Sequence, residues 1–259
     1  LLAPRGVLRL ATALFAVSLT MLALTLLLGP EIKGATRWLP VGGLLVQPSE
    51  FVKPAVAVLI GYILARHAGL YGLMGVCGLS APVLALLVAQ PDMGMSALVA
   101  ASIGVQLVVA GLPWLVILIL LSLAIGASLA AYALFAHVRM RVHAFLDPEL
   151  TPYQVEKALR AFESGGLFGV GPGQGVVKYH LPEAHADFVF ATLAEEFGII
   201  ACLIVLLLFF ALSVRALLRL YASEDRFVVF AGSGLLAQFA LQALLNMAVN
   251  LALLPAKGT

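Results

Sequence analysis

The sequence contains little charge and little cysteine. Only 11% of its 259 residues are charged, whereas soluble domains carry about 25%, so an ordinary water-exposed surface is excluded. Cys77 and Cys202 both lie in apolar runs, which indicates small buried hydrophobic side chains rather than a disulfide or zinc site. No charged segment with an apolar core and a cleavage site marks a signal peptide. Because the sequence begins with Leu1, we expect a piece of a longer polypeptide.

Apolar residues are instead abundant, at 63% of the chain. A helix needs roughly 20 apolar residues to cross a bilayer core of ~30 Å. These runs are apolar on every face, unlike barrel strands, which alternate apolar and polar residues. The sequence therefore predicts an all-α polytopic membrane protein, with a single membrane domain over residues 1–259. Its predicted transmembrane helices are near residues 7–29, 48–65, 69–89, 93–111, 113–137, 187–213 and 227–254.

The short loops predict the orientation of the chain. If the spans alternate, one side carries Arg5, Arg9, Arg66, Arg215, Arg219 and Arg226. This side is cytoplasmic by the positive-inside rule, from which long loops are exempt. The opposite, external side then receives residues 30–47, 90–92 and the long loop 138–186.

The long external loop 138–186 has its own pattern. Tyr153, Val155, Leu159 and Phe162 recur at three- and four-residue spacing, which predicts an amphipathic helix lying on the membrane or on other spans. Glycines crowd residues 165–175, either as a flexible connector or because the backbone approaches another segment closely.

Pro182 and Glu183 predict a helix start after the glycines, since proline and acidic residues both favour the first helical turn. Asp187 then falls about one turn further along, on the same face as Glu183. We expect Asp187 to lie where the span meets water.

Several motifs resemble one known family. They are GGLFGVGPGQG at 165–175, PEAHADFVFATLAEEFG at 182–198, KGATRW at 33–38, QPSE at 47–50 with Lys53, QPDMG at 90–94, and NMAVNLALLPAKG at 246–258. Together, and in this order, they resemble the SEDS family (shape, elongation, division and sporulation) of peptidoglycan polymerases. The PEAH spelling and Lys257 favour the FtsW-like division branch over the RodA-like elongation branch. The resemblance implies about ten spans, so we expect both ends to be incomplete.

The resemblance implies a glycosyltransferase that polymerises lipid II into glycan strands during septal cell-wall synthesis. The reaction inverts the anomeric carbon and releases undecaprenyl diphosphate. Asp187 matches the essential acidic position of the family's external loop and is the predicted catalytic base. The predicted residues for binding lipid II and its diphosphate are Arg37, Lys53, Lys178 and Lys257, with Glu50, Glu183, His185 and Glu196 in support.

The resemblance also implies partners and a place in the cell. The implied partners are a class B penicillin-binding protein and other division proteins, and no nucleic acid is expected. The implied place is the bacterial inner membrane, with the site on its external face. We expect no metal held by the protein, although Mg²⁺ or Mn²⁺ can accompany the diphosphate.

Structural roles compete with these assignments. Asp187 could cap a helix or form a salt bridge, and the cations could be anchors or local pairs, such as Glu50 with Lys53. Asp92 is expected to cap the helix that begins at Met93. Glu195 and Glu196 lie inside a predicted span, where ionisable groups are costly, so we expect at least one to be paired.

Two other functions stay open from the sequence alone. A lipid II flippase would be expected to place charges near the middle of the membrane, often in repeated broken helices, and we find no internal repeat. A non-catalytic division scaffold is the other alternative.

Overall fold

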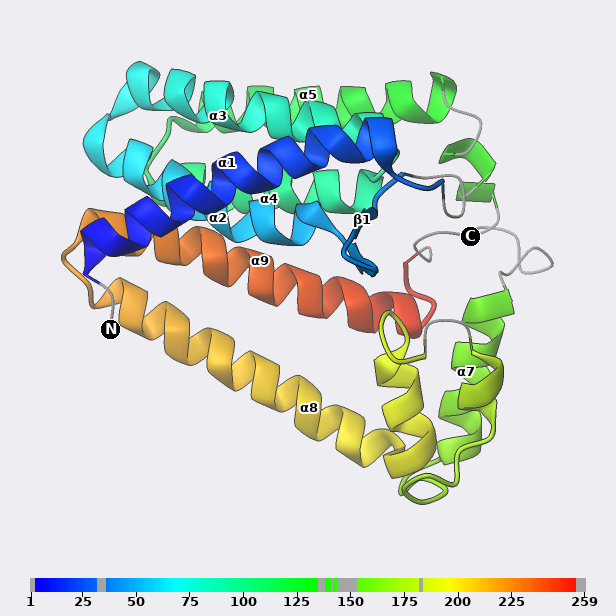
Figure 1. The fold of residues 1–259 in the computed structure, drawn as a ribbon. Helices are drawn as coiled ribbons and strands as arrows, with labels where there is room; N and C mark the ends of the chain where they lie inside the picture. Colours follow the sequence, from blue (N-terminus) through cyan, green and yellow to red (C-terminus); the bar gives the residue numbers. More distant parts are fainter. Residues whose placement is uncertain are drawn as a thin grey trace. The chain divides into compact units, whose positions relative to one another are not determined.

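The computed structural model describes residues 3–31, 36–134, 138–140, 142–143, 153–181 and 184–254. Its apolar helices lie where the sequence predicts spans (Figure 1). Five are long and apolar enough to cross a membrane, whereas α4 and the apolar part of α5 are 17 residues long. The all-α membrane fold is therefore confirmed. The helices are α1 (Pro4–Leu28), α2 (Pro48–Arg66), α3 (Gly69–Ala89), α4 (Met93–Val109), α5 (Trp114–Leu134), α8 (Val189–Tyr221) and α9 (Arg226–Asn250).

The chain divides into two compact units. The first holds residues 1–119 and 215–239, and the second holds residues 120–214 and 240–257. The predicted site residues are distributed over both units, with Arg37, Glu50 and Lys53 in the first and Lys178, Asp187 and Glu196 in the second.

Helix α2 is the centre of the first unit. It packs against α1, α3 and α4, and most of its side chains are buried. Polar side chains between the helices satisfy backbone groups: Gln106 Nε2 donates to the carbonyl oxygens of Ala57 (2.8 Å) and Phe230 (2.9 Å). Gln238 Nε2 donates to the carbonyl oxygen of Lys53 at 2.9 Å. Such pairing matters in a membrane because no water reaches the hydrocarbon core to replace it.

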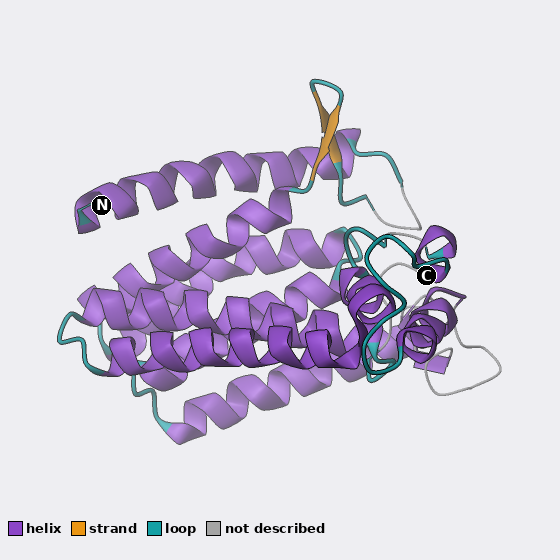
Figure 2. Cartoon of the chain, turned by 90° about the horizontal axis from the view of Figure 1, so that it is seen from below, coloured by secondary structure: helices purple, strands orange, loops and turns teal. Residues whose placement is uncertain are grey.

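A β-hairpin that the sequence analysis did not predict follows α1. Strands β1 (Leu39–Val41) and β2 (Leu44–Val46) pair antiparallel, as the two orange strands of Figure 2 show. Gly42 and Gly43 form the turn with φ of 57° and 85°. A two-residue turn with positive φ at both positions is the type that matches strand twist. The Gly-Gly pair between apolar residues was the available signal.

The second unit contains the predicted amphipathic helix, α7 (Tyr153–Gly165). Half of its predicted apolar face is buried: Val155 lies in the core and Phe162 packs against it, whereas Tyr153 and Leu159 are exposed. Small residues replace them in the core, as Ala158 and Ala161 are fully buried. They share one buried cluster with Phe188 and Ala191, at the start of α8.

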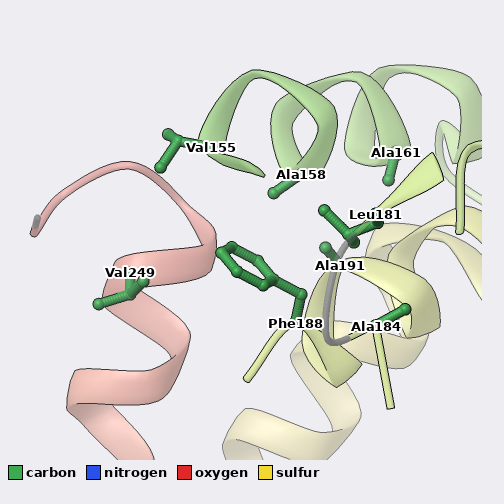
Figure 3. Packing of buried hydrophobic residues seen from close by; sticks show 8 residues of the cluster. All are labelled: Val155, Ala158, Ala161, Leu181, Ala184, Phe188, Ala191 and Val249. Atoms are coloured by element: carbon green, nitrogen blue, oxygen red, sulfur yellow. The ribbon is translucent and has the colours of Figure 1, made fainter. Parts of the chain in front are cut away.

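Phe188 is the largest side chain in the core that α7 covers. It is 1% exposed, and its ring lies among Ala158, Leu181 and Val249 (Figure 3). Burying a phenylalanine side chain contributes about 1.5–3 kcal/mol. This core therefore fixes the chain immediately after Asp187.

Helix α8 is not continuous, although the sequence predicts a single span over residues 187–213. Gly198 has φ 79° and ψ 177°, which breaks the helix between Phe197 and Ile199. Only glycine adopts this conformation readily. A break at membrane depth is tolerated only where the freed backbone groups find other partners.

The glycine-rich segment 165–171 supplies these partners. The N–H groups of Val170 and Gly171 donate to the carbonyl oxygens of Glu195 and Glu196, both at 3.0 Å. On the far side of the break, Ile199 N–H donates to the Gly166 carbonyl oxygen at 2.9 Å. Of the two readings of the glycines, close approach of the backbone is therefore correct.

Candidate functional site

Asp187 precedes α8 instead of lying one turn inside it. Residues 184–188 form a turn and the helix begins at Val189. The predicted helix start at Pro182 and Glu183 lies outside the described residues. The helix is thus shorter at this end than the sequence indicates, and Asp187 lies two residues before it.

The side chain of Asn250, at the end of α9, explains the late start of α8. Its Nδ2 donates to the carbonyl oxygen of Asp187 at 2.7 Å, and its Oδ1 accepts the N–H of Ala191 at 2.9 Å. In a regular helix these two backbone groups would bond to each other. The inserted amide satisfies both and holds the turn open. Asn246 Nδ2 also donates to the Asp187 carbonyl oxygen, at 3.2 Å.

Asp187 is partly exposed on this anchored backbone. The next residue, Phe188, is buried in the core below α7, so both the Asp187 carbonyl group and the residue after it are held. His185, a predicted supporting residue, lies two positions earlier and is exposed. The site thus presents a partly exposed acidic residue from a turn whose backbone is held by α9.

Lys178 and Glu196 form an ion pair between the external loop and α8. The hydrogen bond from Lys178 to the Glu196 carboxylate raises the pKa of Lys178 above its ordinary value of 10.5. The amine therefore stays charged at any physiological pH. This pair agrees with the expectation that at least one acid of this span is paired, and it engages a lysine predicted to bind the diphosphate.

Glu195 is 1% exposed and binds backbone groups. Its carboxylate accepts the N–H groups of Val176 (2.6 Å), Val177 (2.7 Å) and Lys178 (2.9 Å). These residues begin the 3₁₀ helix η2 (Val177–His180), whose free N–H groups favour an anion. Glu195 therefore fixes the loop that carries Lys178.

In the first unit, Lys53 and Glu50 form a salt bridge on α2 with an Nζ–Oε2 distance of 2.7 Å. The Lys53 side chain is 4% exposed and that of Glu50 is 40% exposed. The pair therefore extends from the buried face of the helix towards its surface. From the sequence, a local Glu50–Lys53 pair was an alternative to substrate binding by Lys53. The structure contains this pair.

Arg37 lies beside the turn between α3 and α4. Its Nη2 donates to the carbonyl oxygen of Pro91 at 3.1 Å, and its Nε is 3.7 Å from Asp92 Oδ2. Asp92 Oδ1 accepts the N–H of Met95 at 3.3 Å and caps α4. The predicted capping role of Asp92 is confirmed.

Three parts of the prediction fall outside the described residues: Lys257, Glu183, and residues 33–35 of the KGATRW motif. Among the residues that are described, no group of three or more His, Cys, Asp or Glu side chains is placed to hold a metal ion. A divalent ion accompanying the diphosphate stays a prediction.

The sequence reading missed the roles of Asn246 and Asn250. The signal for them was present, because the two are four residues apart in an apolar helix and such residues share a face. Polar side chains at these positions in a span need partners. Which segment they bind could not be read from the spacing.

The fold and these residues define a class: a multi-pass α-helical membrane protein with an acidic residue on the turn before a span that is broken at Gly198. The family model FTSW_RODA_SPOVE, described as "Cell cycle protein", matches residues 1–259. The chain belongs to this family.

Two curated relatives are each named "Probable peptidoglycan glycosyltransferase FtsW". The protein of Caulobacter vibrioides is 38% identical over 100% of this chain and 67% of its own length. That of Allochromatium vinosum is 37% identical over 95% of this chain and 65% of its own length. The chain thus spans about two thirds of the length of these relatives.

Solved structures show the same fold. A chain from a structure described as "Structural coordination of polymerization and crosslinking by a peptidoglycan synthase complex" has a TM-score of 0.81 and 30% identity, covering 99% of this chain and 75% of that one. A mutant of the rod shape determining protein RodA of Thermus thermophilus has a TM-score of 0.68 and 29% identity, covering 99% and 72%.

Proposed function

We propose that this chain is the catalytic membrane domain of a peptidoglycan glycosyltransferase of the FtsW type, which polymerises lipid II. Both curated relatives are named "Probable peptidoglycan glycosyltransferase FtsW", and they match 100% and 95% of this chain. The observation that carries the mechanism is the position of Asp187, a partly exposed acidic residue on a turn whose backbone is held by α9.

In the proposed reaction, Asp187 acts as the general base. It removes the proton of the acceptor's 4-hydroxyl group while that oxygen attacks the anomeric carbon of the donor sugar. A new C–O bond forms with inversion, the bond from the anomeric carbon to the phosphate oxygen breaks, and undecaprenyl diphosphate leaves with the electron pair. A positioned base contributes roughly 10²–10⁴-fold to such a step.

The leaving diphosphate requires positive charge. Arg37 and Lys53 are the proposed partners among the described residues, and Lys257 is proposed from the motif that contains it. Arginine binds phosphate oxygens in a bidentate manner, and lysine binds them as a point charge. Lys178 is a further proposed partner of the diphosphate. Glu196 holds it as Glu50 holds Lys53, and the Lys178–Glu196 pair also joins the external loop to α8.

We further propose that the site faces the outside of the cytoplasmic membrane and that a class B penicillin-binding protein crosslinks the product. One structural relative belongs to a structure described as a peptidoglycan synthase complex, which supports the second point. The arginines of the short loops support the first.

The test is polymerisation of labelled lipid II by purified full-length protein and its Asp187→Asn variant. We expect loss of polymer, at least 10²-fold, with lipid II binding retained, because an amide keeps the shape but removes the base. Glu163→Gln is the matched control, since Glu163 is an exposed acid on α7 and should leave activity unchanged. Full activity of Asp187→Asn would contradict the base assignment. Transfer of lipid II across vesicles without any polymer would favour a flippase instead.

A further inference from the structure

Two asparagines in the last turns of an apolar helix need an explanation. Asn250 is 0% exposed, and burying an amide is costly unless its hydrogen bonds are made. All of its bonding groups are used: Nδ2 donates to the carbonyl oxygens of Asp187 (2.7 Å) and Asn246 (2.8 Å), and Oδ1 accepts from Ala191 (2.9 Å).

These partners fix how the amide is oriented. The Ala191 N–H can only donate and the Asp187 carbonyl can only accept, so the oxygen must face Ala191 and the nitrogen must face Asp187. A carboxylate at position 250 could not make both bonds. An alkyl side chain could make neither.

Stability of α8 alone does not require this amide. Without it, Ala191 N–H and the Asp187 carbonyl could close the ordinary helical hydrogen bond, and α8 would simply begin earlier. The amide instead keeps that turn open. Its effect is on where the Asp187 backbone lies, and hence on where the carboxylate points.

We propose that Asn250, supported by Asn246, is a positioning residue for the carboxylate of Asp187. The inference rests on the proposed function, in which Asp187 is the base. The carbonyl of Asp187 is held from α9 and the side chain of Phe188 is buried in the core. A misplacement of about 1 Å can cost 10²-fold in rate.

The first test measures kcat and KM for lipid II polymerisation by the full-length Asn250→Ala variant. We expect kcat to fall about 10²-fold, while KM, lipid II binding and the melting temperature in detergent stay close to those of the wild type. Asn246→Ala, which removes the longer contact, should lower kcat less. Gln154→Leu is the control, because Gln154 is also a buried amide of the second unit but its Oε1 has no hydrogen-bond partner. Its kcat should be unchanged.

The second test uses the pH profile of Asn250→Asp. The introduced carboxyl group would face two carbonyl oxygens in a buried site, which favours its protonated form. When protonated, it can accept from Ala191 and donate to Asp187. We therefore expect kcat to lie nearer to that of the wild type at low pH and to fall relative to the wild type as pH rises and the group ionises.

The outcomes separate the two proposals. If Asp187→Asn is inactive but Asn250→Ala has the kcat of the wild type, the positioning role is wrong and the base assignment stands. If Asn250→Ala loses lipid II binding and thermal stability together with activity, its role is structural and the inference also fails. If Asp187→Asn is active, the proposed mechanism itself is wrong.

Discussion

Lys178 and Glu196 join the external loop to the first half of α8 through their charged groups. The backbone carbonyl of the same Glu196 accepts the N–H of Gly171, so one residue of the span holds the loop at two points. This double attachment holds the loop against the first half of α8, just before the break at Gly198.

The first prediction concerns this pair. Lys178→Met should lower the melting temperature, because it leaves the Glu196 carboxylate without its cation. The pKa of Lys178 is raised above 10.5 in the folded state, so the pair's contribution is fully present below that value and is lost as pH rises through the raised pKa. The difference from the wild type should thus be constant between about pH 6 and 9 and shrink above about pH 10.5.

Arg160→Met is the matched control for Lys178→Met. Arg160 forms an ion pair with Glu156 on α7, but both side chains are about half exposed, at 58% and 47%. Such surface pairs contribute little, so its melting temperature should match that of the wild type. Equal effects of the two substitutions would contradict the role assigned to Lys178.

The second prediction separates the two roles of Asp92. Asp92→Asn keeps an oxygen that can cap α4 but removes the charge near Arg37, whereas Asp92→Ala removes both. We expect Asp92→Ala to destabilise the protein by about 1 kcal/mol through the lost cap, and Asp92→Asn to cost much less. Thermal unfolding in detergent measures both, and a larger loss for Asp92→Asn would mean that the charge matters more than the cap.

The third prediction concerns the break in α8. A Cβ at Gly198 would overlap the backbone of Leu167 and Gly169, and its φ of 79° is unfavourable for other residues. Gly198→Ala should therefore destabilise the second unit by more than the roughly 1–3 kcal/mol of backbone strain alone. Limited proteolysis of the loop and the melting temperature report this directly.

Gly104→Ala provides the comparison for Gly198→Ala. Gly104 lies within α4, and a Cβ there meets no atom within 4 Å. Replacing glycine by alanine in a helix is favourable by about 0.5–1 kcal/mol. We expect unchanged or slightly raised stability for Gly104→Ala. If Gly198→Ala is equally stable, the positive φ at the break in α8 is not required.

The fourth prediction tests the orientation. With Cys77 and Cys202 replaced by alanine, a cysteine introduced by Ser164→Cys, on α7, should react with a membrane-impermeant thiol reagent in intact spheroplasts. A cysteine introduced by Glu224→Cys, between α8 and α9, should react only after permeabilisation. Both positions are exposed. The reverse pattern would overturn the positive-inside assignment.

The sequence predicted the spans well because a run of apolar residues reports burial or lipid contact without reference to the rest of the fold. It also predicted the cap at Asp92, which depends only on neighbours in the chain. The start of α8 was misplaced because Asn250, 63 residues away from Asp187, takes the hydrogen bonds of its first turn. Local patterns could not show this.

The same distinction applies to the candidate site. The glycines of residues 165–175 indicated an unusual backbone but not its partner, since the break at Gly198 becomes evident only when both segments are seen together. Glu195 and Glu196 were recognised as costly in a span. Their different partners, backbone N–H groups for one and Lys178 for the other, depend on how the loop folds.

The hydrogen bonds between the glycine-rich segment and the broken helix also set a rule for building chimaeric enzymes. Residues 165–171 and 195–200 complete each other's backbone, so neither has a full set of partners without the other. An external loop transplanted from one relative to another brings its own spacing of carbonyl and N–H groups to the recipient's break. The two segments therefore depend on each other structurally, and a functional graft has to exchange them together.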